Sequence, residues 1–266
     1  MKSMFLFCLL LLGLNLSAQK GESIDVPLSQ PGKRGLLIVD IKKGPIKVKG
    51  TARQDVLVRY NSLSEDDEMN ETRNGLKKIA SGGLNLSITE KDNIVSVDSD
   101  SWNKGVEIYV EIPMDFDLKI ESYNDGDLSV ENVKGELELE SYNGQIEAEN
   151  ISGSLVASTY NGDIRVHFNT ITTDASMAFS TYNGDIDLKF PTNLSAKLKM
   201  RSDAGDIYSD YDIKLNKKAN RESKKDAHSG VFKVSIEKWT HGTVGSGSAE
   251  IVAKTYNGDI LVQKSK

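Results

Sequence analysis

Residues 141–164 read SYNGQIEAENISGSLVASTYNGDI, and this stretch contains two copies of one turn motif. Ser141-Tyr142-Asn143-Gly144 returns eighteen residues later as Thr159-Tyr160-Asn161-Gly162. Further copies lie at 122–128, 181–186 and 255–260, a degenerate copy lies at 202–207, and an early copy without tyrosine lies at 43–46. The motif glycines Gly126, Gly144, Gly162, Gly184 and Gly205 are 18, 18, 22 and 21 residues apart. Such a fixed period indicates a repeat architecture.

Each repeat contains two short strands joined by turns. Apolar residues alternate before the motif, as in Leu137 and Leu139, and again after it, as in Ile164 and Val166. A period of two is typical of a half-buried strand, and Asn-Gly supplies the positive φ angles of a tight turn. A second turn signal, Glu-Asn-(Val/Ile)-x-Gly, occurs at 131–135 and 149–153. The pattern therefore predicts an all-β, single-domain β-solenoid of stacked coils of about 18–22 residues.

The chain begins with a three-part leader. Lys2 precedes an apolar run at 4–12, and a stretch of small and polar residues ends at Ala18. This is the plan of a secretory signal peptide, and the run is too short to span a bilayer. We therefore expect residues 1–18 to be removed and the solenoid domain to occupy residues 19–266, with no membrane span in the mature chain. Its location would be the periplasm, the outer-membrane surface or the extracellular space.

Two segments break the repeat. Residues 61–105 contain the acidic run 65–68 and Trp102, and we expect an insertion with irregular strands there, with the best helical pattern at 66–80. Residues 214–230 are rich in Lys, Asn and Ser and predict a mobile basic loop. The chain then closes on the coil at 255–260.

Composition excludes several classes of site. The single cysteine, Cys8, lies in the leader, so the mature chain has no disulfide or thiolate metal site. The formal net charge of −6 argues against nucleic acid as a partner. Charge is also uneven, since residues 111–149 hold twelve acids and two bases, whereas Lys197, Lys199 and Arg201 come later. Opposite charge at the two ends could favour association of rods, or serve solubility alone.

Strand alternation predicts which motif residues face outward. Leu137 and Leu139 point inward, so Ser141 also points inward and Tyr142 points outward. The same parity predicts an inner hydroxyl row at Ser122, Ser141, Thr159, Thr181, Ser202 and Thr255. It predicts an outer tyrosine row at Tyr123, Tyr142, Tyr160, Tyr182 and Tyr256. It predicts an outer aspartate row at Asp127, Asp163, Asp185, Asp206 and Asp259, which Gln145 interrupts.

Each outer row has a functional and a structural interpretation. The tyrosines could bind sugar rings or a partner's apolar surface, or they could stack on one another and shield the turns. The aspartates could form a calcium ladder, since calcium prefers hard oxygens, or they could accept backbone N–H groups at the corners. We favour the structural interpretation of both rows and expect no metal and no cofactor.

The sequence resembles a known family at three places. They are the strand and turn at 35–50, the Val110-Glu111-Ile112-Pro113 segment that opens the repeats, and the closing residues 245–260. These resemble the bacterial putative-adhesin family, a domain of unknown function. The resemblance implies an exported β-solenoid and brings no catalytic residues with it.

The predicted function is therefore an exported, non-catalytic, adhesin-like binding or envelope-associated structural module. The alternative is a carbohydrate-active β-helix enzyme, which would need two opposed carboxylates in a cleft, one of them with a raised pKa. A convex rod without such a cleft would favour the module. The partner is unknown, with a glycan or an envelope protein as candidates. The sequence leaves open the ligand, the handedness of the coil, periplasmic versus surface location, and the oligomeric state.

Overall fold

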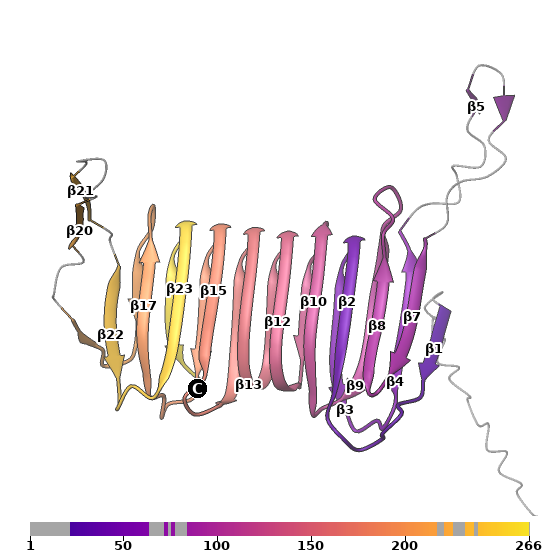
Figure 1. Ribbon diagram of the computed structural model, residues 1–266, viewed down its shortest axis with the longest axis horizontal. Coiled ribbons are helices and arrows are strands. Elements are labelled where there is room, and N and C mark those ends of the chain that lie inside the picture. The colour runs from indigo at the N-terminus through magenta and orange to yellow at the C-terminus, as the bar shows by residue number, and fades with distance from the viewer. Residues whose placement is uncertain are drawn as a thin grey trace, which may run out of the picture.

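The computed structural model describes residues 22–63, 72–73, 76–77, 84–216, 221–225, 232–236 and 239–265. Within these residues every regular element is a β-strand, and no helix is present that could cross a bilayer. Figure 1 shows a rod in which parallel strands lie side by side along one axis. The predicted all-β solenoid is thereby confirmed.

Twenty strands form one hydrogen-bonded sheet that folds into two facing layers, because the long strand β13 takes part in both. The long-strand layer contains, in spatial order, β7 (Leu86–Lys91), β8 (Ile94–Ser99), β2 (Gly35–Lys43), β10 (Phe116–Asn124), β12 (Lys134–Asn143), the second half of β13 (Ile146–Asn161), β15 (Ser176–Asn183), β23 (Ala249–Asn257), β17 (Ala196–Ser202), β22 (Thr240–Val244) and β19 (Lys214–Leu215).

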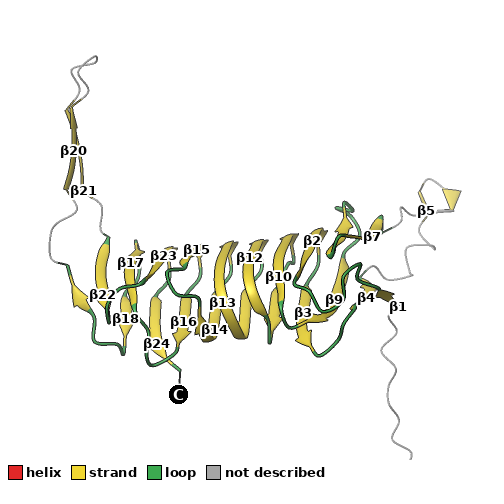
Figure 2. Cartoon of the chain, turned by 60° about the horizontal axis from the view of Figure 1, so that its bottom comes forward, coloured by secondary structure: helices red, strands yellow, loops and turns green. Residues whose placement is uncertain are grey.

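The short-strand layer contains, in the same direction, β1 (Glu22–Val26), β4 (Val56–Ser62), β9 (Val106–Pro113), β3 (Ile46–Thr51), β11 (Leu128–Glu131), the first half of β13, β14 (Ile164–Ile171), β16 (Ile186–Phe190), β24 (Ile260–Lys264) and β18 (Ile207–Ser209). One coil is a long strand, the Asn-Gly corner and a short strand. Figure 2 shows the two layers on either side of the rod.

The core lies between the layers and consists of aligned aliphatic rows. Ile146 pairs in register with Leu128 and Ile164, and all three side chains are at most 1% exposed. Leu137 pairs in the same way with Leu118 and Leu155 in the other layer. Each such side chain stabilises the fold by about 1.5–3 kcal/mol on burial. The alternation in the sequence therefore fixes which face of every strand is inside.

The coils are not stacked in sequence order. The β2–β3 coil lies between the β8–β9 coil and the β10–β11 coil, and the last coil, β23–β24, lies between β15–β16 and β17–β18. The chain does close on the coil at 255–260, but this coil lies inside the stack and not at its end. Tyr256 and Asn257 match the motif of the β15 coil, whereas Asp203 and Ala204 of the degenerate coil do not. The degenerate coil consequently lies outside the motif coils.

The Asn-Gly corner is held by hydroxyl groups from the inner row. Ser141 Oγ donates to the carbonyl of Gly126 in the neighbouring coil at 2.9 Å, and Thr159 Oγ1 donates to that of Gly144 at 2.9 Å. The other inner hydroxyls do the same, from Ser122, Thr181, Ser202 and Thr255. Buried hydroxyls need such partners, so these small residues lock each coil to the next.

The motif glycine is required because adjacent corners approach closely. A Cβ atom on Gly162 would lie 2.2 Å from the carbonyl oxygen of Gly144, and one on Gly184 would lie 2.2 Å from that of Gly162. Gly162 has a φ of 155°, but Asn161 does not have a positive φ, so the predicted Asn-Gly turn is only half correct. At the second corner Asn132 and Asn150 have φ values of 59° and 56° and do adopt the left-handed conformation.

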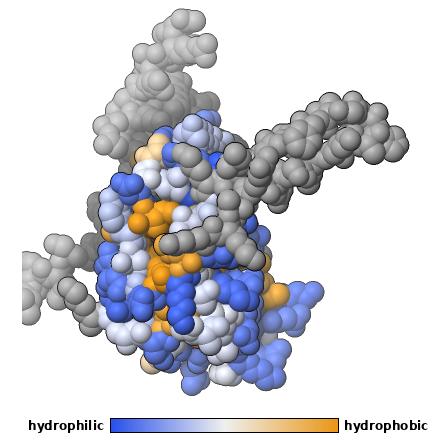
Figure 3. All heavy atoms as spheres, turned by 90° about the vertical axis from the view of Figure 1, so that its left-hand side faces the viewer, coloured by the Kyte–Doolittle hydropathy of each residue, from blue (hydrophilic) through white to orange (hydrophobic). Residues whose placement is uncertain are grey.

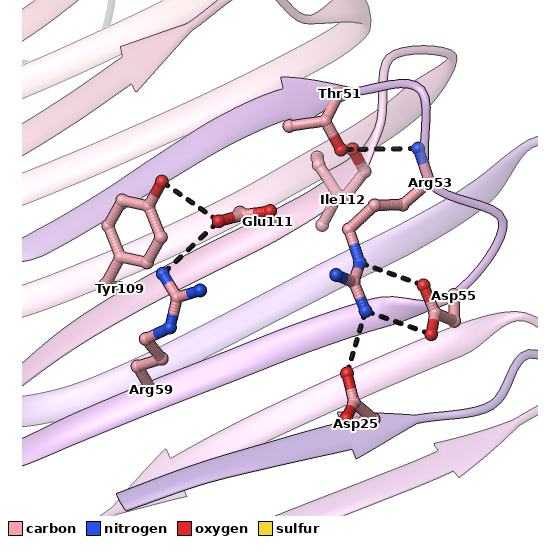
Figure 4. A network of polar contacts seen from close by, with 8 residues as sticks. All are labelled: Asp25, Thr51, Arg53, Asp55, Arg59, Tyr109, Glu111 and Ile112. Atoms are coloured by element: carbon pink, nitrogen blue, oxygen red, sulfur yellow. Dashed lines mark hydrogen bonds and ion pairs between the residues drawn. The ribbon is translucent and has the colours of Figure 1, made fainter. Parts of the chain in front are cut away.

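Antiparallel strands close the β1 end of the rod. β1 pairs with β4, β4 pairs with β9, and β7 pairs with β8. Figure 4 shows that Arg53 reaches Asp25 of β1 at 2.7 Å and also binds Asp55, while Arg59 binds Glu111 at 3.2 Å. These contacts attach the capping strands to the first coils.

The opposite end carries exposed apolar surface. β22 covers the edge of β17 in the antiparallel direction, and β18 forms a short edge strand in the other layer. Figure 3 looks onto this end and shows hydrophobic surface among hydrophilic residues. Tyr208 of β18 and Leu215 of β19 are 52% and 57% exposed. Short edge strands limit pairing with other chains.

The two segments that break the repeat contain more strand than predicted. Residues 84–99 of the first segment form regular strands, and β8 is a full member of the long-strand layer. The helical candidate at 66–80 is contradicted by β5 (Thr72–Arg73) and β6 (Leu76–Lys77), which pair with each other. In the second segment, β19 pairs with β22, and β20 (Arg221–Lys225) pairs with β21 (Phe232–Ile236), so its described residues include paired strands that were not predicted. Residues 64–71, 74–75 and 78–83 of the first segment, and residues 217–220 and 226–230 of the second, lie outside the described ranges.

We predict that Gly162→Ala lowers the free energy of unfolding by about 1–3 kcal/mol more than Gly32→Ala does. Both glycines have positive φ, but a Cβ on Gly32 would meet nothing within 4 Å, so only Gly162 adds a clash with backbone. Chemical denaturation of the two variants measures the difference. Equal losses would show that stacking of the corners does not require glycine.

Candidate binding face: the tyrosine row

Five tyrosines form a continuous stack along the Asn-Gly edge of the rod. The ring centroids of Tyr123, Tyr142, Tyr160, Tyr182 and Tyr256 are successively 4.7, 5.1, 4.9 and 4.8 Å apart. The ring planes differ by only 1–7° between neighbours. The spacing follows from the separation of paired strands, which places one ring on every coil. We call these five residues the tyrosine row.

The position of the row follows from strand parity. Each tyrosine comes near the end of a long strand, one residue after an inner hydroxyl that is buried. The tyrosines are 40–45% exposed, whereas Thr255 is 0% exposed and Ser141 is 3% exposed. The predicted outward direction of the tyrosines and inward direction of the hydroxyls are thus both found in the structure.

Stacking determines which part of each ring is available. Because neighbouring rings are parallel and close, their faces cover one another, and the outward surface consists of ring edges and phenol hydroxyls. Of the two interpretations of the tyrosines given above, the structure shows the one in which they stack on one another, so their ring faces are not open platforms for a ligand. The tyrosine row therefore presents a line of phenol hydroxyl groups above a narrow apolar surface of ring edges, with one hydroxyl per coil.

An asparagine row lies directly behind the tyrosines. Asn161 Nδ2 donates to Asn143 Oδ1 at 2.7 Å, and Asn183 Nδ2 donates to Asn161 Oδ1 at 2.7 Å. The row continues to Asn124 at one end and Asn257 at the other. A ladder of identical amides satisfies each side chain from the coils on both sides and fixes the backbone from which the tyrosines project.

The aspartate row lies on the other side of the corner and binds backbone. Asp163 Oδ1 accepts the N–H of Asp185 at 2.9 Å, and Asp185 Oδ1 accepts the N–H of Asp259 at 2.8 Å. Asp127 and Asp259 do the same for Gln145 and Asp206. Among the described residues no group of three or more carboxylate, histidine or cysteine side chains is placed to hold a metal ion. The geometry therefore gives the aspartates a structural use at each corner.

Both ends of the row are defined by residues that are not tyrosine. Trp102, in the loop between β8 and β9, contacts Tyr123 edge-on with centroids 5.1 Å apart and is 55% exposed. The β2 coil lies between the loop of Trp102 and the coil of Tyr123, and it has Lys42 at the position equivalent to tyrosine. At the other end, the β17 coil next to Tyr256 has Asp203 at that position. Trp102 is not recognisable from the repeat as a neighbour of the row, because it lies outside the repeat and its coil is two positions away from that of Tyr123 along the rod.

Charged residues flank the tyrosines on the long-strand layer. Glu121 and Glu140 lie two residues before Tyr123 and Tyr142, whereas Lys254 lies two residues before Tyr256. The acidic side extends to Asp40 and Asp98, which pair in register. Burial raises the pKa of Asp98, and the neighbouring charge of Asp40 raises that pKa further. Tyr123 and Tyr142 are thus flanked by acid, and Tyr256 is flanked by base. Tyr160 and Tyr182 have serines at the same position, Ser158 and Ser180.

Two hollows in the described part of the chain lie away from the row. The larger, about 520 Å³, lies at the β1 end and contains Asp25 and Glu90. Asp25 binds Arg53, and hydrogen bonds from Ser29 lower the pKa of Glu90. A general acid needs a raised pKa, so this pair does not fit the carbohydrate-active alternative. The second hollow, about 300 Å³, lies beside Lys197 and Lys199.

A family model described as Toastrack DUF4097 matches residues 115–263, more than half of the chain. The chain belongs to this family. The resemblance seen in the sequence is thereby confirmed. The Toastrack match contains all five tyrosines, whereas the β2–β3 coil lies outside the matched residues and still pairs with β10 and β11.

Two solved structures are similar to this Toastrack chain. One is described as a putative cell adhesion protein from Clostridium sporogenes, with 10% identity, a TM-score of 0.41, and coverage of 92% of this chain and 100% of the other. The second is described as a putative adhesin from Bacteroides fragilis, with 12% identity, a TM-score of 0.37, and coverage of 92% and 98%. No curated protein sequence is significantly similar to the chain.

Proposed function

We propose that this protein is an exported, non-catalytic binding module that uses the tyrosine row to bind an extended polymer of the cell envelope, such as a glycan. The observation that carries the proposal is the registered stack of five half-exposed rings on one edge of a rigid rod. Soluble proteins seldom expose a continuous aromatic ribbon of this kind without a partner.

The repeat of the row suggests a ligand that is itself periodic. The phenol hydroxyls recur once per coil, at spacings of 4.7–5.1 Å between rings. This is close to the length of one pyranose unit in an extended polysaccharide, so successive sugars could meet successive tyrosines. Ring edges would contact the apolar faces of the sugars, while the hydroxyls and the flanking Glu121, Glu140 and Lys254 would form hydrogen bonds.

Replacing Tyr142 and Tyr160 with Ser should weaken binding to isolated peptidoglycan or to ligands on a glycan array by roughly thirty-fold. Two lost contacts of about 1 kcal/mol each give this factor. The matched control is Tyr208→Ser, which removes a tyrosine of 52% exposure outside the row and should leave affinity unchanged. A loss of melting temperature without any loss of affinity per folded molecule would restrict the row to a structural role.

The double variant Tyr142→Phe with Tyr160→Phe distinguishes ligand contacts with the ring edges from hydrogen bonds to the phenol hydroxyls. Phenylalanine keeps the stacked rings and the melting temperature but removes the hydroxyls, since neither hydroxyl is used within the described structure. We expect affinity to fall by about ten-fold for two lost hydrogen bonds, measured by the same binding assay. Unchanged affinity would show that the ligand contacts only the ring edges.

Export is part of the proposal and is tested separately. Residues 1–21 lie outside the described residues, and the leader at 1–18 has the pattern of a cleaved signal peptide. Intact-mass measurement of protein recovered from the cell envelope should give a chain that begins at Gln19. Recovery of the full-length mass from the cytosol would contradict it.

A further inference from the structure

The outward surface of the long-strand layer has opposite charges at its two sides. Five adjacent strands, β12, β13, β15, β23 and β17, form a flat face of three registered rows. The rows are Glu136, Ser154, Ser176, Glu250 and Lys197; then Glu138, Val156, Ala178, Val252 and Lys199; then Glu140, Ser158, Ser180, Lys254 and Arg201. We call this surface the five-strand face.

Three glutamates on β12 oppose three basic residues on β17 across a centre of mostly small side chains, which also holds Glu250 and Lys254 of β23. Strand β15 is the middle strand, with β13 and β23 on either side of it. Glu138 is paired with Lys119 at 3.3 Å, but Glu136 and Glu140 form no ion pair with any described residue. Lys199 lies over the ring of Trp239 at 4.4 Å and forms no ion pair within the described ranges. On the basic side, Lys197 pairs with Glu250 at 3.6 Å and Arg201 pairs with Asp203 at 2.9 Å. Within the described residues, the charges of Glu136, Glu140 and Lys199 are therefore without an ion pair, whereas Lys197 and Arg201 would share theirs with a partner.

We propose that the five-strand face docks against the same face of a second copy of the chain. A two-fold axis that lies in the interface and runs along β15 exchanges the two sides of the face. β12 then lies over β17 of the second copy, and β13 lies over β23. This rotation preserves the height of each residue along its strand and reverses the order of the strands. Each row of one copy therefore faces the same row of the other copy in reversed order, which makes the interface isologous.

The residues brought together by this axis are complementary in every row. Glu136 meets Lys197, Glu138 meets Lys199, and Glu140 meets Arg201, and the axis repeats all three pairs on the other side. Opposite charges placed in this way determine orientation and register more strongly than affinity. In the alternative dimer the order of the strands is not reversed, so β12 lies over β12 of the second copy. The three glutamates would then face three glutamates, and repulsion between like charges disfavours this dimer.

The centre of the face is suited to close packing of two sheets. Val156 is 44% exposed and would meet Val252 of the second copy, while Ala178 lies on the axis itself. Ser and Ala side chains allow two sheets to approach at or below the usual separation of about 10 Å. Beside Lys197 and Lys199 the hollow of about 300 Å³ leaves room for the incoming glutamate side chains.

The size of the contact is adequate for a specific but modest dimer. Five strands about 4.8 Å apart, each presenting about seven residues of about 3.3 Å, cover roughly 550 Å² per copy. The total of roughly 1,100 Å² just exceeds the ~1,000 Å² expected of a biological interface. We therefore expect a dimer that weakens as salt rises, because its charges lie at the exposed sides of the contact.

The arrangement also places the two tyrosine rows together. Rotation about an axis parallel to the strands leaves the Asn-Gly corners of both copies on the same edge of the dimer. Because the tyrosines project from the same face as Glu138 and Glu140, the two rows would face each other across the interface and run in opposite directions, with Tyr182 nearest the axis. The dimer itself does not depend on whether the row binds a glycan, so the two proposals can fail separately.

Charge reversal tests the interface. One variant changes Glu136, Glu138 and Glu140 to Lys, and a second variant changes Lys197, Lys199 and Arg201 to Glu. Each variant should have a dimer dissociation constant at least about ten-fold higher than that of the wild type. An equimolar mixture of the two variants should form a 1:1 heterodimer, because every facing pair is again opposite in charge. Sedimentation equilibrium at low and high salt measures all three samples, and circular dichroism checks that each variant folds.

The matched control changes the same amount of charge on the other layer. This control variant changes Glu131 of β11 and Glu147 and Glu149 of β13 to Lys. These residues lie on the short-strand layer, so the dimer should remain intact. If a triple variant does not fold, Glu138→Lys and Lys199→Glu provide the same mixing test with one residue each. Monomeric wild type at about 100 μM and low salt, or a dimer that resists both reversals, would overturn the proposal.

A cross-link tests the position of the axis. Cys8 lies in the leader and is the single cysteine of the sequence, so a chain that begins at Gln19 carries only an introduced thiol. Ala178→Cys should be joined to its own copy by a short bismaleimide, because the residue lies on the axis. Glu147→Cys on the opposite layer should not be joined. Equal cross-linking of the two variants would show that the five-strand face is not the interface.

Discussion

The whole structure depends on the hydrogen bond from an inner hydroxyl to the glycine carbonyl of the neighbouring coil. Ser141 and Thr159 illustrate it, since each reaches a carbonyl of the adjacent corner at 2.9 Å. The bond is possible only when a glycine allows the corners to approach and a small hydroxyl fits inside. Once it forms, the coils are held in register, and every other row is aligned as a consequence.

Alignment converts ordinary turn residues into continuous surfaces. Tyrosine, asparagine and aspartate occupy fixed positions around the motif glycine, so each becomes a ladder along the rod. The asparagines bind one another, and the aspartates bind backbone N–H groups, so their polar atoms are used within the fold. The tyrosine hydroxyls and ring edges remain directed toward solvent. For this reason the tyrosine row, and not the aspartate row, is the surface that we connect with function.

The two proposed surfaces have different physical characters. The tyrosine row is narrow, aromatic and uniform along the rod, which suits a periodic ligand. The five-strand face is broad and changes from acidic to basic across five strands, which suits one partner in one orientation. They meet where the long strands end, because Tyr142 follows Glu140 by two residues on the same face of β12. A dimer through the second surface would therefore change the geometry of the first.

The sequence by itself determined the local features of this protein. Alternation in segments such as 137–142 fixes which residues are inside, and the Asn-Gly period predicts the solenoid and the outward tyrosines. The tertiary structure alone decided the order of the coils, the contact of Trp102 with Tyr123, and the position of β17 opposite β12 on one face. The alternation of inward and outward side chains depends only on neighbouring residues in one strand, so it can be predicted from the sequence. Parallel pairing joins segments far apart, and any coil with matching rows can serve, so only the free energy of the complete stack selects the neighbours.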